Sequence, residues 1–379
     1  MRATVLAPAP LQEAVRSGLD SGRELGLQVA AYRGGELVLD LSAGLAAPGG
    51  APVTSETLFP VFSATKAVAA TAVHLQVSRG LLDYGRPVAA YWPEFAAEGK
   101  GRTTVLDALT HRTGIPQMPE GVTPESMCNW DLMAERVAAL TPRWEPGTRT
   151  GYHAYTFGWI TGELVRRTDP QRRPFGRFVL EEICRPLGIE DLWLGIPDEA
   201  EPRVATLVDL PPGPPAGGLL AEALPAHLAT SQAVFGRPDV RRSCHPGAGG
   251  IMNARSLARL YAMLASGGQL GGQRLLSPEV AASLGRLETD DEADAVLGKV
   301  VRKARGFYAY HPDGPDVSAL MPSRNPGNFG HPGSGGSTGW ADPGLGLGVA
   351  VLKNRLLPSA LGESGHLLRI RDAVYEALA

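Results

Sequence analysis

The hydrophobic and polar positions form two β-hairpin patterns, one near each end of the chain. Near the N-terminus, residues 27–44 carry two strand-like runs on either side of Gly34-Gly35, a pair that suits a tight hairpin turn. Near the C-terminus, residues 337–354 carry two further runs, separated by Asp342-Pro343-Gly344. We therefore expect strands from both ends of the sequence.

Helical patterns occupy much of the remaining chain. Residues 64–79 are rich in alanine, contain no proline and are followed by Gly80, which is typical of a helix C-terminus. A helical periodicity with one apolar face predicts further helices at 11–24, at 155–168, at 254–266 after the candidate N-cap Asn253, and at the end of the chain, where Leu367, Ile370, Val374 and Leu378 share one face.

This order of elements indicates the α+β class. We expect one antiparallel sheet built from N- and C-terminal segments and covered by helices, with a mostly helical lobe inserted. The α/β lobe is placed at about residues 1–62 and 245–379, and the helical lobe at about residues 63–244. With 379 residues, the chain is long enough for one two-lobed catalytic unit, residues 1–379.

Composition and charge argue against several kinds of partner. Hydrophobic residues make up 44% of the chain, as in a globular protein with a substantial core. The net charge is -3, the pI is about 6.3 and no basic tract is present, so we expect neither nucleic acid nor an anionic membrane as a partner. No apolar run reaches the roughly 18 residues of a membrane span, and the N-terminus does not look like a signal peptide.

The cysteines and histidines are dispersed along the sequence. The three cysteines, Cys128, Cys184 and Cys244, are odd in number and far apart, which favours reduced thiols in a cytoplasmic protein over a disulfide framework. The eight histidines form no H-x-x-x-H pattern and no cluster with cysteine. We therefore expect no metal site, and no other cofactor is indicated. The oligomeric state stays open.

Two short motifs each contain a candidate nucleophilic serine. Ser337 lies in GGSTG, which satisfies the G-x-S-x-G pattern, but that motif requires a strand before the serine and a helix after it. Here the preceding segment is rich in glycine and does not look like a good strand, and the following segment contains a turn. We therefore interpret Ser337 as the start of a strand. Ser63 lies in FSATK, directly before the helical run 64–79.

Ser63 and Lys66 have the spacing of a nucleophile and its base. At the start of a helix, the Ser63 Oγ lies at the positive end of the helix dipole, and residues i and i+3 share a face. A partly desolvated lysine has a lowered pKa and can accept the serine proton. Because S-x-x-K is short, an N-cap serine beside a solvated lysine remains the alternative on this motif alone.

The wider sequence resembles the serine β-lactamase and penicillin-binding-protein superfamily, and within it the class C-like branch that includes family VIII carboxylesterases and related transacylases. The resemblance covers nearly the whole chain and rests on the order and spacing of several blocks. These are GELVLDLSAG (35–44), VFSATKAVAA (61–70), residues 81–116, PGTRTGYHAYTFGWITGELV (146–165), GAGGIMNARSLARLYAML (247–264) and FGHPGSGGSTGWADP (329–343). It implies a β-lactamase/transpeptidase-like fold.

The resemblance also implies roles for individual residues. Ser63 takes the position of the acylated nucleophile, Lys66 lies beside it, and Tyr152 takes the position of the second-motif tyrosine. The Lys66 cation is expected to lower the pKa of the Tyr152 phenol, and either residue could be the general base because the two titrations are coupled.

The third motif of the family is His331-Pro332-Gly333 in this chain. The resemblance implies that His331 and Gly333 contact the substrate, and that the backbone amides of Ser63 and Ser334 form the oxyanion hole. For His331, a hydrogen bond to Tyr152 and simple packing in the core remain as alternatives. Residues 310–328, a Pro-rich loop just before this motif, are expected to form part of the pocket rim.

Two positions depart from the β-lactamase pattern. The asparagine two residues after the tyrosine is Ala154, which lacks its hydrogen bonds, and the third-motif lysine is His331, which is mostly neutral at pH 7 with an ordinary pKa of about 6.5. We therefore expect a hydrolase of small carboxylic esters, acting through acyl-Ser63 on a small-molecule ester or amide. A transacylase that passes the acyl group to an amine or alcohol, a β-lactamase and a non-catalytic scaffold remain as alternatives.

Overall fold

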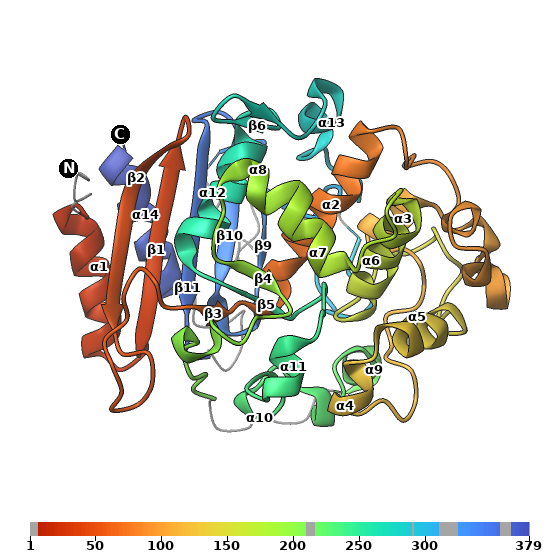
Figure 1. Cartoon of the computed structure of the whole chain (residues 1–379), viewed down its shortest axis with the longest axis horizontal. Helices are drawn as coiled ribbons and strands as arrows, with labels where there is room; N and C mark the ends of the chain where they lie inside the picture. The colour runs from red at the N-terminus through yellow and green to blue at the C-terminus, as the bar shows by residue number, and fades with distance from the viewer. Residues whose placement is uncertain (1–6, 210–216, 290–291, 311–324, 357–364, 379) are drawn as a thin grey trace.

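The computed structural model describes residues 7–209, 217–289, 292–310, 325–356 and 365–378. Its main element is a six-stranded antiparallel sheet with the order β2-β1-β11-β10-β9-β8. The N-terminal hairpin therefore lies beside the C-terminal strands (Figure 1). The strands are β1 (Gly26–Arg33), β2 (Glu36–Gly44), β8 (Tyr308–Ala309), β9 (Phe329–Pro332), β10 (Thr338–Asp342) and β11 (Leu347–Lys353).

Helices cover both faces of this sheet. Helices α1 (Ala9–Asp20) and α14 (Gly365–Leu378) pack together on one face, and α12 (Ala254–Ala265) packs on the other (Figure 1). Side chains alternate between the two faces along a strand, so in β1 Val29 joins the core beneath α1 and α14 while its neighbour Ala30 joins the core that contains α12. This double burial explains why β1 and β11 are almost continuously apolar.

A second, three-stranded sheet supports the segment that precedes Ser63. Its order is β3-β5-β4, with β3 (Phe59–Pro60), β4 (Leu192–Leu194) and β5 (Gly250–Met252). Strand β3 is followed by the 3₁₀ helix η1 (Phe62–Thr65) and then by α2 (Lys66–Ser78), which packs against α6 (Thr156–Thr168).

The remaining helices are mostly short and concentrate in the middle of the chain. They are α3 (Val105–Leu109), α4 (Pro124–Met127), α5 (Trp130–Ala138), α7 (Phe175–Val179), α8 (Arg185–Leu187), α9 (Gly218–Ala223), α10 (Gln232–Phe235), α11 (Pro238–Arg242) and α13 (Pro278–Ser283), and the small strands β6 (Gln269–Leu270) and β7 (Gln273–Arg274) lie just before α13. Across the described ranges, no helix is long and apolar enough to cross a membrane. The lobe boundaries near residues 62 and 245 stay a prediction.

The predicted α+β class is confirmed, with one error of detail. Both hairpins form, and Gly34 and Gly35 have φ values of 58° and 92°, which an L-residue rarely adopts. The segment before Ser337, which we expected not to be a strand, contains β9. Gly330 in this strand allows β9 to lie close to β10, because a Cβ on Gly330 would lie 2.2 Å from the carbonyl oxygen of Gly339 in β10.

Candidate active site

Ser63 lies on a tightly held turn between β3 and α2. It is the second residue of η1, so its amide is among the first N–H groups of a helix, which have no partner within that helix. Phe62 before it has φ 48°, an unusual value for a bulky residue. Strand β5 fixes the turn, because Val61 N donates to Gly250 O at 3.0 Å and Gly250 N donates to Thr65 Oγ1 at 2.9 Å.

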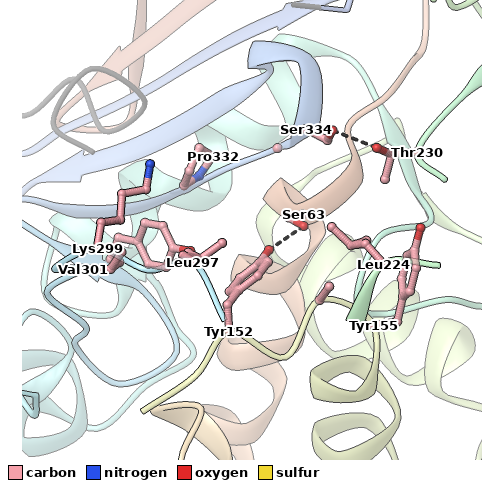
Figure 2. Close-up of a pocket in the computed structure, with 13 residues that line it drawn as sticks. Ser63, Tyr152, Tyr155, Leu224, Thr230, Leu297, Lys299, Val301, Pro332 and Ser334 are labelled. Carbon is pink, nitrogen blue, oxygen red and sulfur yellow. Dashed lines mark hydrogen bonds between the residues drawn. The ribbon is translucent and has the colours of Figure 1, made fainter. Parts of the chain in front are cut away.

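Three side chains named by the sequence analysis meet at one oxygen. The Tyr152 hydroxyl donates to Ser63 Oγ at 2.7 Å (Figure 2), and Lys66 Nζ lies 3.0 Å from the same Oγ. Lys66 Nζ also lies 4.9 Å from the centre of the Tyr152 ring. Tyr152 comes from the segment just before α6, far from Ser63 in the sequence, so the fold itself brings the phenol to the helix start.

Lys66 is completely buried, with 0% of its surface exposed. Its Nζ donates to the carbonyl oxygens of Ala154 and Gly247, each at 2.7 Å. Burial lowers the pKa of Lys66 well below its ordinary value of 10.5. A neutral amine has two N–H groups and one lone pair. Since the two carbonyls accept both N–H groups, the lone pair is available to the Ser63 hydroxyl.

The ionisation of Tyr152 differs from the sequence expectation. Burial raises the pKa of Tyr152 above its ordinary value of 10.0 and the nearby Asp294 raises it further, while the hydrogen bond with Ser63 acts in the opposite direction. The expected lowering by Lys66 is wrong, because burial of the phenol disfavours the phenolate more than the hydrogen bond with Ser63 favours it. Tyr152 is therefore a phenol at neutral pH and acts as a hydrogen-bond donor.

His111 fixes the backbone on both sides of Tyr152. Its carbonyl oxygen accepts from Gly151 N and its Nδ1 accepts from His153 N, each at 3.0 Å. Its own backbone has φ 60°, and its ring stacks on Phe157. His111 thus orders the turn that presents Tyr152 to Ser63.

The third motif approaches the nucleophile turn through Gly333. A Cβ at this position would lie 2.1 Å from the carbonyl oxygen of Val61, so only glycine permits this approach. The next residue, Ser334, begins the 3₁₀ helix η7 (Ser334–Gly336), and its amide therefore has no partner within that helix. Ser334 Oγ lies 2.8 Å from Thr230 Oγ1 (Figure 2). Gly333 and Ser334 line the same cavity as Ser63.

The structure does not place His331 on the wall of this cavity. Only 1% of its surface is exposed, its Nδ1 donates to the carbonyl oxygen of Pro332 at 2.8 Å, and its ring packs on Tyr308 and Tyr152 with centroid distances of 4.6 and 6.3 Å. Burial lowers the pKa of His331 to about 3, and Lys66 in its protonated form acts in the same direction. The expected substrate contact is therefore replaced by packing behind Tyr152, because the residue faces inward from β9.

Ser337 has none of the features of a nucleophile. It is buried, its Oγ accepts from Lys353 N at 3.2 Å, and β10 follows it where the nucleophile-elbow motif requires a helix. The interpretation of Ser337 as the start of a strand agrees with this geometry.

A cavity of about 150 Å³ opens onto Ser63 (Figure 2). Lys299 contributes a charged side chain to its wall, whereas Ala154 contributes a methyl group where β-lactamases have asparagine. The rest of the wall is largely apolar, formed by Tyr155, Leu224, Leu297, Val301, Tyr308 and Pro332. Most of the loop expected at the rim, residues 311–324, lies outside the described residues. Within the described ranges, no group of three metal-binding side chains lies close enough together to hold an ion.

Two residues near the site escaped the sequence analysis. Thr230 was not singled out, and nothing in its surroundings marks it. Asp294 accepts a hydrogen bond from Tyr152 N at 3.0 Å, although the two residues are 142 positions apart. Locally, Asp294 Oδ1 accepts hydrogen bonds from the amides of Val296 and Leu297, two and three residues later. This is the pattern of an Asx-turn.

Comparison with known proteins agrees with the site and the fold. The β-lactamase family model matches residues 11–371. The esterase/β-lactamase LipL of Mycobacterium tuberculosis is 34% identical over 368 residues, which cover 93% of this chain and 82% of that protein. A crystal structure of a family VIII carboxylesterase has a TM-score of 0.89 at 34% identity and covers 97% of this chain and 96% of its own. A penicillin-binding-protein homologue from Caulobacter crescentus has a TM-score of 0.88 at 34% identity, over 99% of each chain.

These similarities define a serine hydrolase of the carboxylesterase-like type on a β-lactamase/transpeptidase-like fold, as the sequence predicted. The chain belongs to the β-lactamase family.

Proposed function

We propose that the protein hydrolyses small carboxylic esters through an acyl-enzyme on Ser63. The observation that supports this is the contact of Ser63 Oγ with both the Tyr152 hydroxyl and the buried Lys66 amine. Neutral Lys66 accepts the Ser63 proton as Oγ attacks the ester carbonyl carbon. The amides of Ser63 and Ser334 donate to the oxyanion that forms, and losing one such donor typically costs about 10²–10³ in rate.

Tyr152 returns the proton to the leaving group. When the tetrahedral intermediate collapses, the carbon–oxygen bond to the alcohol breaks, and the phenol beside Ser63 Oγ donates its proton to the departing alkoxide. The Lys66 ammonium then reprotonates Tyr152, so the proton taken from Ser63 ends on the alcohol. Water attacks the acyl-Ser63 carbonyl with the same two groups acting in reverse, and the carboxylic acid is released.

Two positions near Ser63 support an ester rather than a β-lactam. Ala154 and the buried His331 offer neither the amide nor the cation that β-lactamases have at these two positions, although Lys299 supplies a charged side chain elsewhere on the wall. Two of the similar proteins are named as an esterase and as a carboxylesterase, which supports an ester. Because one of them is also named as a β-lactamase, nitrocefin is the appropriate comparison substrate. We expect its turnover to be far slower than that of a short-chain ester, and comparable turnover would contradict the preference for esters.

The same apolar wall favours a second acceptor besides water. Tyr155 and Leu224 line the cavity beside Ser63 and would contact the apolar group of an alcohol or amine. Attack of that acceptor on acyl-Ser63 would give a new ester or amide. Product analysis in the presence of added alcohol separates the two reactions, because a transacylase forms the new ester at the expense of the acid.

Covalent labelling provides the decisive experiment. After treatment with a fluorophosphonate, mass spectrometry of the intact protein and of its peptides should show one adduct, on Ser63. Ser63→Ala should lose both the label and the hydrolysis of nitrophenyl acetate, and Ser337→Ala, the matched control, should keep both. An adduct on Ser337, or hydrolysis that survives Ser63→Ala unchanged, would rule the proposal out. Absence of any adduct together with absence of turnover would favour a non-catalytic scaffold.

We also propose that the enzyme works in the cytoplasm on small molecules, without a nucleic acid partner. The net charge of -3 and the absence of a basic tract support the second point. The odd number and wide spacing of the cysteines support the first.

A further inference from the structure

Asp294 is a buried carboxylate outside the reacting groups, yet it binds the segment that carries one of them. Its Oδ1 accepts from the backbone N–H groups of Tyr152 at 3.0 Å, Val296 at 2.9 Å and Leu297 at 2.8 Å. Its Oδ2 accepts from Lys303 Nζ at 2.8 Å, and the side chains of Asp294 and Lys303 are 0% and 1% exposed. Both carboxylate oxygens are therefore used, by donors from separate segments.

The same residue closes the loop that forms one wall of the cavity. Asp294 N donates to Lys299 O, and Gly298 N donates to Asp294 O, each at 2.8 Å. Leu297, Lys299 and Val301 of this loop line the cavity beside Ser63 (Figure 2). Asp294 thus connects the tyrosine segment to the wall that faces the substrate.

Lys303 keeps this carboxylate ionised inside the protein. Burial acts to raise the pKa of Asp294, but the Lys303 charge, the Lys303 hydrogen bond and the backbone amides hold it below its ordinary value. An ionised carboxylate accepts stronger hydrogen bonds from backbone amides than a neutral group does. The geometry and the charge together make Asp294 a firm anchor for the Tyr152 amide.

We propose that Asp294 is a positioning residue that sets where the Tyr152 hydroxyl lies relative to Ser63 and the leaving group, a role that rests on the proposed ester hydrolysis. A tyrosine side chain has few rotatable bonds, so its backbone position largely determines where its hydroxyl lies. Misplacement of a reacting group by about 1 Å can cost about 10²-fold in rate. Asp294 does not line the cavity and acts through Tyr152.

A purely structural ion pair is the competing explanation, and a matched pair of double variants separates the two. Asp294→Asn/Lys303→Met removes both charges but keeps an oxygen that can accept from the Tyr152 amide. Asp294→Leu/Lys303→Met removes the same charges and also the acceptor. The loss of the ion pair is common to both variants, so their difference reports the bonds from Oδ1 to the amides of Tyr152, Val296 and Leu297. A reaction step that depends on Tyr152 then separates the bond to Tyr152 from the other two.

The measurement uses a reaction step that depends on Tyr152. An alkyl ester needs a proton on its leaving alcohol, whereas a nitrophenolate leaves without one, so a displaced Tyr152 slows alkyl esters selectively. The test compares kcat/KM for the ethyl and nitrophenyl esters of one acid, at a temperature at which each variant is fully folded. Each rate is divided by the amount of enzyme whose Ser63 a fluorophosphonate labels. Asp294→Asn/Lys303→Met should keep the wild-type ratio of the two rates. Asp294→Leu/Lys303→Met should lower the ethyl ester rate about tenfold or more beyond any loss with the nitrophenyl ester, and we expect the same selective loss in Tyr152→Phe.

A double-mutant cycle completes the test. Adding Asp294→Leu/Lys303→Met to Tyr152→Phe should cause no further selective loss, because the hydroxyl that it would displace is already absent. If Asp294→Leu/Lys303→Met does not fold, Asp294→Glu, which keeps the charge but moves the acceptor by one methylene, should show the same selective loss. A wild-type ratio in the folded variants would overturn the inference while the proposed function stands. An unlabelled, inactive wild-type protein would overturn both.

Discussion

Loss of activity at low pH is expected to follow the protonation of Lys66. Because burial lowers its pKa well below 10.5, the amine loses its proton and gains its lone pair at a lower pH than an exposed lysine. As pH falls below that value, kcat/KM should fall about tenfold per pH unit, and above it the rate should reach a plateau. His153 and His331, with pKa values of about 4 and about 3, titrate too low to cause a decline at neutral pH. The raised pKa of Tyr152 should keep the plateau flat at mildly alkaline pH.

Lysine-to-arginine exchange tests the same assignment directly. Lys66→Arg keeps a cation that cannot lose its proton, so kcat/KM should fall by about 10²–10⁴, the usual contribution of a general base. Lys100→Arg is the matched control, because Lys100 is also buried and its Nζ also donates to two backbone carbonyls, those of Ala97 and Leu140. This role would be contradicted if kcat/KM decreased as the pH is raised from neutral to mildly alkaline values. Equal losses of kcat/KM in Lys66→Arg and Lys100→Arg would also contradict it.

Among the elements, the approach of β9 to η1 positions the Ser334 amide, which we propose as an oxyanion donor. Gly333→Ala would place a Cβ within 2.1 Å of the Val61 carbonyl oxygen, and the strand must move to relieve this contact. We expect kcat to fall by about 10²–10³, because the Ser334 amide moves away from the oxyanion, while the free energy of unfolding falls by only about 1–3 kcal/mol.

Gly344→Ala is the control for Gly333→Ala, because it lies in the exposed turn between β10 and β11 and its added Cβ would meet only Asp342 Oδ1, at 3.4 Å. Steady-state kinetics and urea unfolding of both variants distinguish a lost oxyanion donor from simple destabilisation. Near-normal kcat in folded Gly333→Ala would show that this close approach is not needed for catalysis.

Elements defined by their own residues were predictable from the sequence, and those defined by a distant partner were not. The N-cap of α12 was predicted because Asn253 bonds within its own turn, to Ser256 N. The hairpin at Gly34-Gly35 was predicted because the turn itself requires these glycines. Strand β9 was missed because its glycine looked unfavourable for a strand. Gly330 is needed there because the backbone of β10 lies too close for a Cβ, and that contact cannot be read from the local sequence.

At the scale of the whole molecule, the site forms where segments from all along the chain meet. Ser63 and Lys66 are one helical turn apart, so their spacing alone suggested their contact. Tyr152 could be named only through the resemblance to a family, and Asp294 left no signal that pointed to Tyr152. The direction of the Tyr152 pKa shift was also beyond the sequence, because burial is a property of the completed packing.

A buried ion pair links the two end segments of the chain, which together build the sheet. Lys353 Nζ at the end of β11 donates to Glu24 Oε1, between α1 and β1, at 2.6 Å, and both side chains are 1% exposed. Lys353→Met leaves the Glu24 charge buried without this partner, so we expect the free energy of unfolding to fall by about 3–5 kcal/mol. Glu24→Leu/Lys353→Met removes both desolvated charges and should recover most of that loss. Urea unfolding of the two variants provides the measurement, and a single variant as stable as the double one would show that the pair does not hold the ends together.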